Sequence, residues 1–201
     1  MHDYTGPHDY FNESYVREWA EAANVKRPFR GEIFARFAIE LDALRKPKVL
    51  DIGSGPGFLA DYLLTRCDIS SYHLFDFSPH MLELSRARLA RFGDRVCHHQ
   101  GSFLDEAWWA ALPGPFDAIV SMQAVHEVRD AARIPQLYGE LRRLLGERGI
   151  LLIADQVNSE DKQEEHFLTA KEHEAAFARA GFEEYRQIDA AGDLALFGAK
   201  R

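Results

Sequence analysis

Short apolar runs alternate with helical patterns through most of this chain. Runs with the length of buried strands occur near Lys48 to Ile52, Tyr72 to Phe75, Arg95 to His99, Phe116 to Ser121 and Ile150 to Ala154. The segments between them carry apolar residues at the spacing of amphipathic helices. Since parallel strands are joined by helical crossovers, this alternation predicts an α/β fold with helices on both faces of a mostly parallel sheet.

The part of the chain before these strands predicts helices. Residues 1 to about 12 show no clear period and are expected to form a loose arm, and two helices are expected between Asn12 and Leu44. The second helix has an apolar stripe made by Ile33, Phe34, Phe37, Ala38, Leu41 and Leu44.

The part after residue 130 predicts two more helices and a hairpin. A helix is expected over Arg133 to Leu145, and the charged stretch Asn158 to Glu165 is expected to be a solvated loop. Thr169, followed three residues later by Glu172, has the capping-box pattern that opens a helix. The final segments Phe182 to Ile188 and Leu194 to Ala199, separated by a glycine-containing turn, predict a closing hairpin.

Length and composition narrow the class of protein. With 201 residues, 46% of them hydrophobic, the chain suits one domain over residues 1–201, with an N-terminal arm and helices over 1–45 and a ligand-binding core over 46–201. The formal net charge of −8 leaves no basic face for nucleic acid, so a small-molecule partner is expected. Cys67 and Cys97 lack the spacing of a zinc site, and no metal is expected. No segment resembles a signal peptide or a membrane span, so we expect a cytoplasmic protein with no membrane partner, either monomer or homodimer.

A glycine-rich turn follows the first predicted strand. Gly53, Gly55 and Gly57 alternate with other residues in the sequence VLDIGSGPGFLA. Such glycines let a ligand approach the backbone and allow the positive φ that a sharp strand-to-helix turn needs. Asp51 ends the apolar strand just before this turn, and its carboxylate needs a cation or hydrogen-bond donors as partner. The partner of Asp51 is expected to be either an ammonium group on the ligand or hydrogen-bond donors in the loop.

A second carboxylate narrows the ligand to a nucleoside. Asp76 ends the next predicted strand, 23 residues after Gly53, where a carboxylate can accept hydrogen bonds from both ribose hydroxyls. A nicotinamide dinucleotide would require the pattern G-x-G-x-x-G, but Phe58 stands at the third glycine position. The turn is therefore not shaped for a pyrophosphate.

These residues resemble the class I S-adenosylmethionine-dependent methyltransferase family, whose first motif is D/E-x-G-x-G-x-G. The segments VLDIGSGPGFLA, LFDFSPHML, FDAIVSMQAVHEV and ELRRLLGERGILLIAD are similar to that family over about residues 47 to 155. The resemblance implies a Rossmann-like seven-stranded sheet with its last strand antiparallel, an N-terminal helical lid, and S-adenosylmethionine as cofactor, released as S-adenosylhomocysteine.

The resemblance also implies a set of cofactor-binding residues. The glycines would cradle the methionine and ribose part, Asp51 would meet the amino group, and Asp76 would hold the ribose. Phe77 and Met81 would lie against the adenine. Many family members have an acid after the third strand for the adenine amino group, whereas this chain has Ser102 beside Phe103. The cofactor-binding set is Asp51, Gly53, Ser54, Gly55, Gly57, Asp76, Phe77, Met81, Ser102, Phe103, Ser121 and Gln123.

Methyl transfer needs alignment of the acceptor and removal of its proton. His126, just after the fourth strand, is the expected general base by analogy with relatives that carry histidine there. A structural histidine is the alternative. An aromatic acceptor pocket would be lined by Tyr10, Phe11, Tyr15 and Trp19, although these rings could instead pack on the sheet. The expected activity is methylation of a hydroxyl, amine or similar nucleophile of a small molecule. The alternative is a non-catalytic protein that binds S-adenosylmethionine or S-adenosylhomocysteine on the same fold.

Overall fold

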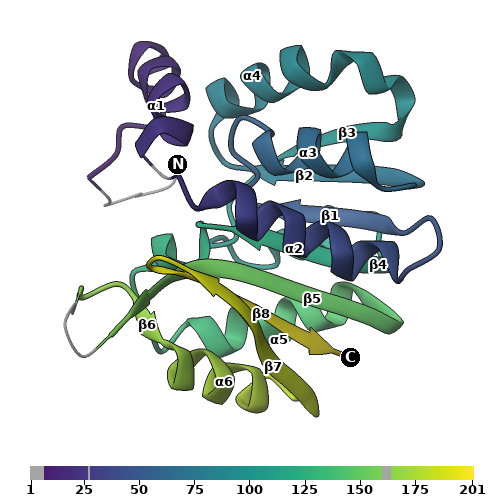
Figure 1. Cartoon of the computed structure of the whole chain (residues 1–201), viewed down its shortest axis with the longest axis vertical. Helices are drawn as coiled ribbons and strands as arrows, with labels where there is room; N and C mark the ends of the chain where they lie inside the picture. The colour runs from purple at the N-terminus through teal and green to yellow at the C-terminus, as the bar shows by residue number, and fades with distance from the viewer. Residues whose placement is uncertain (1–6, 27, 160–163) are drawn as a thin grey trace.

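The computed structural model describes residues 7–26, 28–159 and 164–201, and a central β-sheet flanked by helices dominates it (Figure 1). Seven strands follow the order β3-β2-β1-β4-β5-β8-β7, and the two-residue β6 pairs with β5 beside this path. The strands are β1 (Lys48–Ile52), β2 (Ser71–Asp76), β3 (Val96–Gln100), β4 (Phe116–Met122), β5 (Leu145–Asn158), β6 (Leu168–Thr169), β7 (Glu184–Ala191) and β8 (Leu194–Lys200).

The direction of the strands matches the prediction. Strands β1 to β5 pair in parallel, whereas β8 is antiparallel to both β5 and β7. The hairpin predicted at the end of the chain supplies this antiparallel pair. The predicted fold class, a mostly parallel sheet with its last strand antiparallel, is therefore confirmed.

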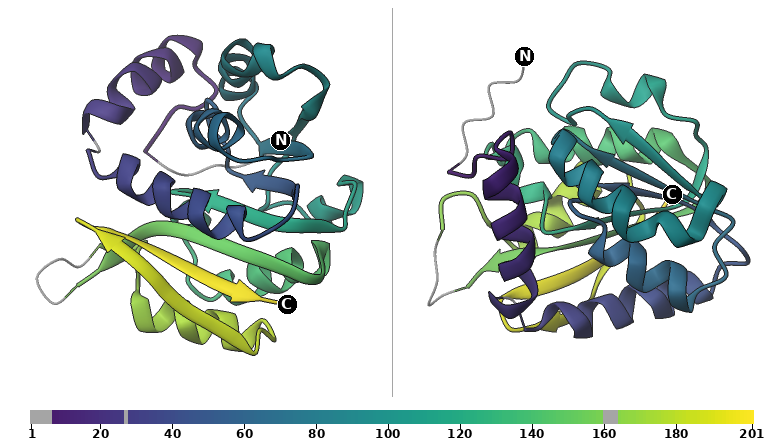
Figure 2. Two further views of the ribbon diagram at one scale, coloured as in Figure 1. Left: turned by 45° about the vertical axis from the view of Figure 1, so that its right-hand side comes forward. Right: turned by 90° about the horizontal axis from the view of Figure 1, so that it is seen from above.

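Helices cover both faces of the sheet (Figures 1 and 2). Apolar side chains of α2, α3 and α4 form one buried cluster with the residues that β1, β2 and β4 turn toward that face, among them Val49 and Val120. On the other face, α5 and α6 pack on Leu50, Ile52 and Ile119. The helices are α1 (Glu13–Lys26), α2 (Arg30–Asp42), α3 (Phe58–Arg66), α4 (Pro79–Leu89), α5 (Ile134–Leu144) and α6 (Ala170–Arg179), with 3-10 turns η1 (Ala90–Arg95), η2 (Trp108–Ala111) and η3 (Val125–Val128).

Local signals placed two of these helices well. Ile33, Phe37 and Leu41 on the predicted stripe of α2 are fully buried. At the start of α6, Thr169 Oγ1 accepts a hydrogen bond from the backbone N–H of Glu172, and Glu172 Oε2 accepts one from the N–H of Thr169 at 2.7 Å. The predicted capping box is therefore confirmed.

The predicted boundary between α5 and β5 was wrong. We expected the helix to reach Leu145 and the strand to begin at Ile150, but α5 ends at Leu144 and β5 begins at Leu145. Leu145 pairs with Phe116, whereas Ile150 pairs with Ala118, so the extra residues form a bulge. At its other end β5 reaches Asn158, where we had expected the solvated loop to begin; residues 160–163 of that loop lie outside the described residues.

The N-terminal segment contacts the core. Helix α1 packs against α4, and the described part of the predicted arm, residues 7–12, is held where Ser78 Oγ donates a hydrogen bond to the carbonyl of Tyr10 at 2.6 Å. Residues 1–6 of that arm lie outside the described residues. The segment thus forms the predicted N-terminal lid beside the ends of β1 and β2.

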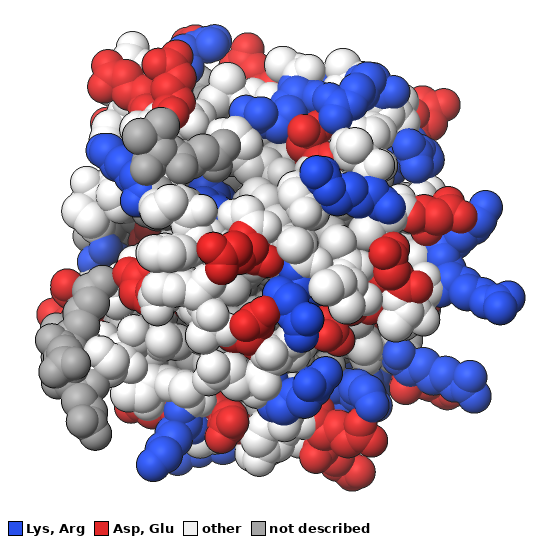
Figure 3. All heavy atoms as spheres, in the orientation of Figure 1, with Lys and Arg blue, Asp and Glu red and all other residues white. Residues whose placement is uncertain are grey.

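The surface mixes both signs of charge on the face drawn in Figure 3, with basic side chains most frequent over α3 and α4. Among the helices in the described part of the chain, none is both long enough and apolar enough to cross a membrane. Within the same part, no three or more His, Cys, Asp or Glu side chains are grouped so as to hold a metal ion.

Candidate active site

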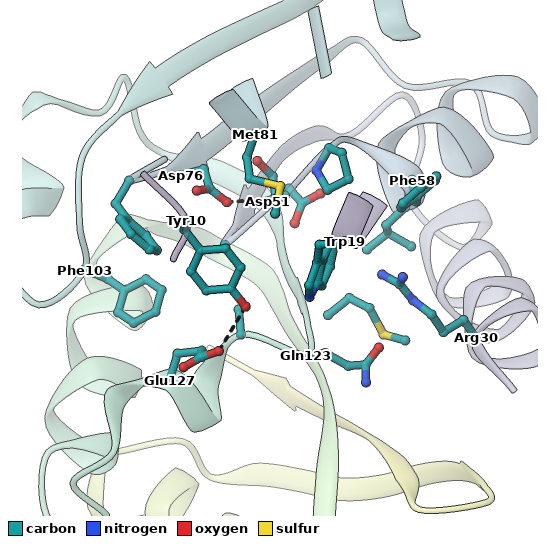
Figure 4. A pocket seen from close by; sticks show the side chains of 18 of the residues that line it. Tyr10, Trp19, Arg30, Asp51, Phe58, Asp76, Met81, Phe103, Gln123 and Glu127 are labelled. Carbon is teal, nitrogen blue, oxygen red and sulfur yellow. Dashed lines mark hydrogen bonds between the residues drawn. The ribbon is translucent and has the colours of Figure 1, made fainter. Parts of the chain in front are cut away.

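A cavity lies at the carboxyl ends of β1, β2 and β4, where ligands of open α/β sheets bind (Figure 4). We refer to it as the first cavity. Most of the residues predicted from the sequence line it: Tyr10, Trp19, Asp51, Gly53, Ser54, Gly55, Asp76, Phe77, Met81, Phe103 and Gln123. Among the described residues, Gly57, Ser102, Ser121, Tyr15 and His126 are not part of this lining.

The glycine turn shapes the floor of the first cavity. Gly53 and Gly55 have φ values of +63° and +55°, a conformation that other residues rarely adopt. A Cβ on Gly53 would lie 2.2 Å from Ala124 Cβ, whereas a Cβ on Gly55 would meet no atom within 4 Å. Gly53 is thus needed for packing, and Gly55 leaves open space for a ligand. Gly57 instead precedes α3 and faces Ser85 of α4.

Asp76, the last residue of β2, holds the glycine turn by hydrogen bonds to the backbone. Its Oδ2 accepts a hydrogen bond from the Gly55 N–H at 2.8 Å, and its Oδ1 accepts one from the Ser78 N–H at 2.9 Å. Burial raises the pKa of Asp76 to about 6, although these backbone donors act in the opposite direction. The Phe77 N–H acts in the same direction, and since a carboxylate has about four lone-pair sites, Asp76 can still accept a hydrogen bond from a ligand hydroxyl.

Asp51 is almost fully buried, with 1% of its surface exposed. The Tyr72 hydroxyl donates a hydrogen bond to its Oδ2 at 2.9 Å. Burial raises the pKa of Asp51 to about 8; the hydrogen bond from Tyr72 lowers it, and the charge of Asp76 raises it further. A cationic ligand group beside Asp51 would restore its ionised form.

Two predicted serines contribute to the frame of the site. Ser121 Oγ donates a hydrogen bond to the carbonyl of Ile52 at 3.1 Å and so joins β4 to β1. Ser102 Oγ accepts one from the Leu104 N–H at 3.1 Å, within the loop that carries Phe103. Neither serine lines the first cavity within the described residues.

Gln123 lies between two cavities. It has a positive φ of 56°, which is strained for a residue other than glycine, and its N–H donates to the carbonyl of Ala154 at 2.7 Å. Its buried side-chain oxygen has no hydrogen-bond partner among the described residues, and neither has the Ser54 hydroxyl. Two orphaned polar groups at one cavity indicate a polar ligand.

The second cavity adjoins the first and has a volume of about 500 Å³. Trp19 and Gln123 line both cavities, and Tyr15, Phe29 and Leu194 form much of the apolar wall of the second. By contrast, the free space in the first cavity is about 70 Å³, and the ring of Tyr10 lies across it (Figure 4). Ligand pockets usually exceed about 300 Å³, so the first cavity is smaller in this structure than a nucleoside needs.

His126 precedes Glu127 in η3, the 3-10 turn after β4. Its Nδ1 donates a hydrogen bond to Asp155 Oδ1 at 2.6 Å, and its backbone N–H donates to Asp155 Oδ2 at 2.9 Å. Burial alone would raise the pKa of Asp155, but the charge and hydrogen bonds of His126 together with the charge of His173 lower it below the ordinary value. This anchor leaves Nε2 as the acceptor nitrogen, 3.7 Å from Glu127 Oε1.

Two charged residues that line the first cavity, Glu127 and Arg30, were given no role from the sequence. Glu127 accepts a hydrogen bond from the Tyr10 hydroxyl at 3.2 Å, and Arg30, at the start of α2, points into the cavity (Figure 4). The position of Glu127 after a strand was a usable signal. Arg30 had none, because it precedes the glycine turn and reaches the site only through the packing of α2.

Comparison with known proteins shows which family the chain matches. Residues 49–149 match a family model described as methyltransferase domain. A release factor glutamine methyltransferase from Deinococcus radiodurans is 40% identical over 82 residues, which cover 41% of this chain and 28% of that protein. The curated relatives that the chain matches are longer, and the matched parts cover 5% to 38% of their length.

Solved structures share the fold at low identity. An O-methyltransferase family protein from Burkholderia thailandensis has a TM-score of 0.77 at 18% identity, covering 96% of this chain and 61% of that one. Human N-acetylserotonin methyltransferase, solved in complex with S-adenosylmethionine, has a TM-score of 0.74 at 15% identity, covering 96% and 57%.

Proposed function

This chain belongs to the methyltransferase-domain family, which uses S-adenosylmethionine as methyl donor, and we propose that it methylates a hydroxyl, amine or similar nucleophile of a small molecule. The matched residues include the glycine turn, Asp76 and the turn with His126. The proposal concerns the acceptor and the role of each residue.

The first cavity would hold S-adenosylmethionine. Its adenine would lie by Phe77 and Phe103, its ribose hydroxyls on Asp76, and its ammonium group on Asp51. The residues fit such a ligand, because Gly55 leaves room for it and the buried Asp51 carboxyl favours a cation beside it. When bound, the cofactor supplies an electrophilic methyl group on its sulfonium.

His126 would take the proton of the acceptor. Asp155 fixes the imidazole through Nδ1, so Nε2 is the nitrogen that would accept a proton from a hydroxyl or ammonium group. The buried Asp155 carboxylate then stabilises the imidazolium that forms. The remaining task of the protein is to align the acceptor with the methyl group and exclude water.

One observation carries the choice of a small-molecule acceptor. The second cavity, with a volume of about 500 Å³, has the size of a small-molecule pocket and shares Trp19 and Gln123 with the first. Its wall combines aromatic rings with polar side chains such as His8, Gln156 and Asp193, which suits a compact ring-bearing acceptor with polar substituents.

An acceptor panel tests this proposal. The protein is incubated with S-adenosylmethionine labelled in its methyl group and with phenols, catechols and aromatic amines, and the label is counted in the small-molecule and protein fractions. We expect label in the small-molecule fraction. Label found only in added protein substrates, or none above a denatured control, would contradict the proposal.

A further inference from the structure

Tyr72 brings a hydroxyl to the site from inside the protein. It lies on β2 and is fully buried, and its hydroxyl donates the hydrogen bond to Asp51 Oδ2 at 2.9 Å. Within the described residues Tyr72 is not part of the lining of the first cavity, whereas Asp51 is. Tyr72 can therefore act on a ligand only through Asp51.

The pairing of β1 and β2 fixes the direction of this hydroxyl. In the parallel ladder Tyr72 lies beside Val49, and Leu74 lies beside Asp51. Because side chains two positions apart on a strand point to the same face, Tyr72 and Asp51 share one face of the sheet, where Tyr72 and Val49 belong to one buried apolar cluster. The ring spans the two-residue step between these levels, about 7 Å. The core therefore sets the position of the donor before any ligand arrives.

Asp51 depends on this one donor. Among the described residues, Tyr72 gives the one hydrogen bond that the Asp51 side chain accepts, so Oδ1 is left for a ligand cation. Asp76, by contrast, accepts from several backbone N–H groups. Burial raises the pKa of Asp51 to about 8, and the Tyr72 hydroxyl opposes that rise because it stabilises the charged carboxylate.

We propose that Tyr72 is a positioning residue that holds the Asp51 carboxylate in the orientation that binds the ammonium group of S-adenosylmethionine. This inference rests on the proposed function, because it takes Asp51 as the partner of that group. A hydrogen bond to a charged carboxylate is among the strong ones, and this bond fixes one oxygen while the other remains for the ligand. Tyr72 itself would touch neither the cofactor nor the acceptor.

Calorimetry with two ligands tests the assignment. The probes are S-adenosylhomocysteine, which carries the ammonium group, and 5′-methylthioadenosine, in which a methyl group replaces the whole amino-acid chain. We expect Tyr72→Phe, which removes only the hydroxyl, to bind S-adenosylhomocysteine at least about tenfold more weakly than wild type. Its affinity for 5′-methylthioadenosine should stay within about threefold, because that ligand places no cation beside Asp51.

Tyr138→Phe is the matched control. Tyr138 is also fully buried, and its hydroxyl also makes a buried hydrogen bond, with His173 Nδ1 at 2.8 Å. It lies on α5, which packs on the opposite face of the sheet. Since the same atom is removed at a similar depth but away from Asp51, both affinities should stay within about twofold of wild type.

A double-mutant cycle separates positioning from packing. In the Asp51→Asn background the ammonium group has no carboxylate to meet. Adding Tyr72→Phe there should change the affinity for S-adenosylhomocysteine by less than about threefold, whereas a packing role of the hydroxyl would give the same loss in both backgrounds.

Specific outcomes would overturn the assignment. An equal loss for both probes, the same loss in Tyr138→Phe, or the same loss in the Asp51→Asn background makes Tyr72 a packing residue. If wild type binds S-adenosylhomocysteine and Tyr72→Phe binds it equally well, this inference fails and the proposed function stands; if wild type binds neither probe, both fail.

A measurement on wild type carries the test if Tyr72→Phe does not fold. The carbon NMR signal of Tyr72 Cζ, the atom that bears the hydroxyl, responds to the strength of its hydrogen bond. Binding of S-adenosylhomocysteine should shift this signal, because an ammonium group beside Asp51 favours the charged carboxylate as acceptor, and 5′-methylthioadenosine should leave it in place. A signal that neither probe shifts, or that both shift equally, would contradict the proposal.

Discussion

At the scale of single residues, His126 carries the proposed chemistry. We expect His126→Gln to slow single-turnover methyl transfer by about 100-fold or more, because a general base contributes roughly that factor. The affinity for S-adenosylhomocysteine should stay within twofold of wild type, since His126 is absent from the described lining of the first cavity. Rapid-quench kinetics with an acceptor from the panel measures the rate.

His98→Gln is a matched control for this variant. His98 lies on β3, the edge strand three strands away from β4 and the turn that carries His126, so its replacement should leave the rate unchanged. A loss below about threefold in His126→Gln would exclude a general base there, and a change confined to acceptor affinity would make His126 a positioning residue.

Asp51 gives a prediction on pH and stability. Its pKa is about 8 in the folded chain and 3.8 in an unfolded one, so the folded state holds this proton more tightly. The stability that results is complete below pH 3.8 and is lost as the pH rises to about 8. Asn has no proton to lose, so the Asp51→Asn variant gains stability relative to wild type over that range.

Thermal melts without ligand measure this effect. The Tm difference between Asp51→Asn and wild type should be at least about 2 °C more positive at pH 9 than at pH 5, since 1 kcal/mol shifts Tm by ~2–4 °C in chains of this size. Comparing one variant at two pH values cancels packing effects of the substitution. An equal difference at both values, or a reversed trend, would refute the raised pKa.

Residues within one motif could be found from the sequence, whereas partners brought by pairing could not. Asp51, Gly53 and Gly55 lie within five positions, so their spacing alone forms a recognisable binding motif. Asp155, by contrast, is 29 residues from His126 and reaches it because Ala154 pairs with Met122 in the β4–β5 ladder. The sequence around His126 and the sequence around Asp155 contain no pattern that predicts this hydrogen bond.

At the scale of elements, two glycines in the turn between β1 and α3 have different roles: Gly53 is needed for packing, and Gly55 leaves space for a ligand. Gly53→Ala should lower the free energy of unfolding by about 2 to 5 kcal/mol, because a Cβ at a positive φ is strained and this one meets Ala124 Cβ at 2.2 Å. Gly55→Ala has only the backbone strain, about 1 to 2 kcal/mol, because open space surrounds its Cβ.

Gly53→Ala and Gly55→Ala also serve as controls for each other when ligand affinity is measured. Gly55→Ala places a methyl group in the first cavity and should weaken binding of S-adenosylhomocysteine by at least tenfold, despite its smaller effect on folding. Urea denaturation and calorimetry measure the two quantities. A larger stability loss in Gly55→Ala than in Gly53→Ala would contradict this division of roles.

The boundary of an element could be predicted from the sequence where a side-chain hydrogen bond fixes it. The hydrogen bonds between Thr169 and Glu172 define the start of α6, and that start was predicted. The end of α5 was missed because Leu145 continues the apolar stripe of the helix, while its backbone already pairs with Phe116. A pairing partner 29 positions earlier in the chain decided that boundary.

At the scale of the whole molecule, the site is assembled from the core and the lid. The alternation of strands and helices was sufficient to predict the sheet and therefore the edge where the first cavity lies. The lid residues Tyr10 and Arg30 reach that edge only after α1 and α2 have packed on the core. Their contacts, such as Tyr10 with Glu127, join residues 117 positions apart and leave no local pattern.

The central claim is that the first cavity binds S-adenosylmethionine. Calorimetric titration of S-adenosylhomocysteine into wild type and into Asp76→Ala tests it most directly. The account predicts one site per chain in wild type and an affinity at least tenfold weaker in the variant, because Asp76 would accept the ribose hydroxyls. Absence of binding to wild type, or equal binding to both proteins, would contradict it.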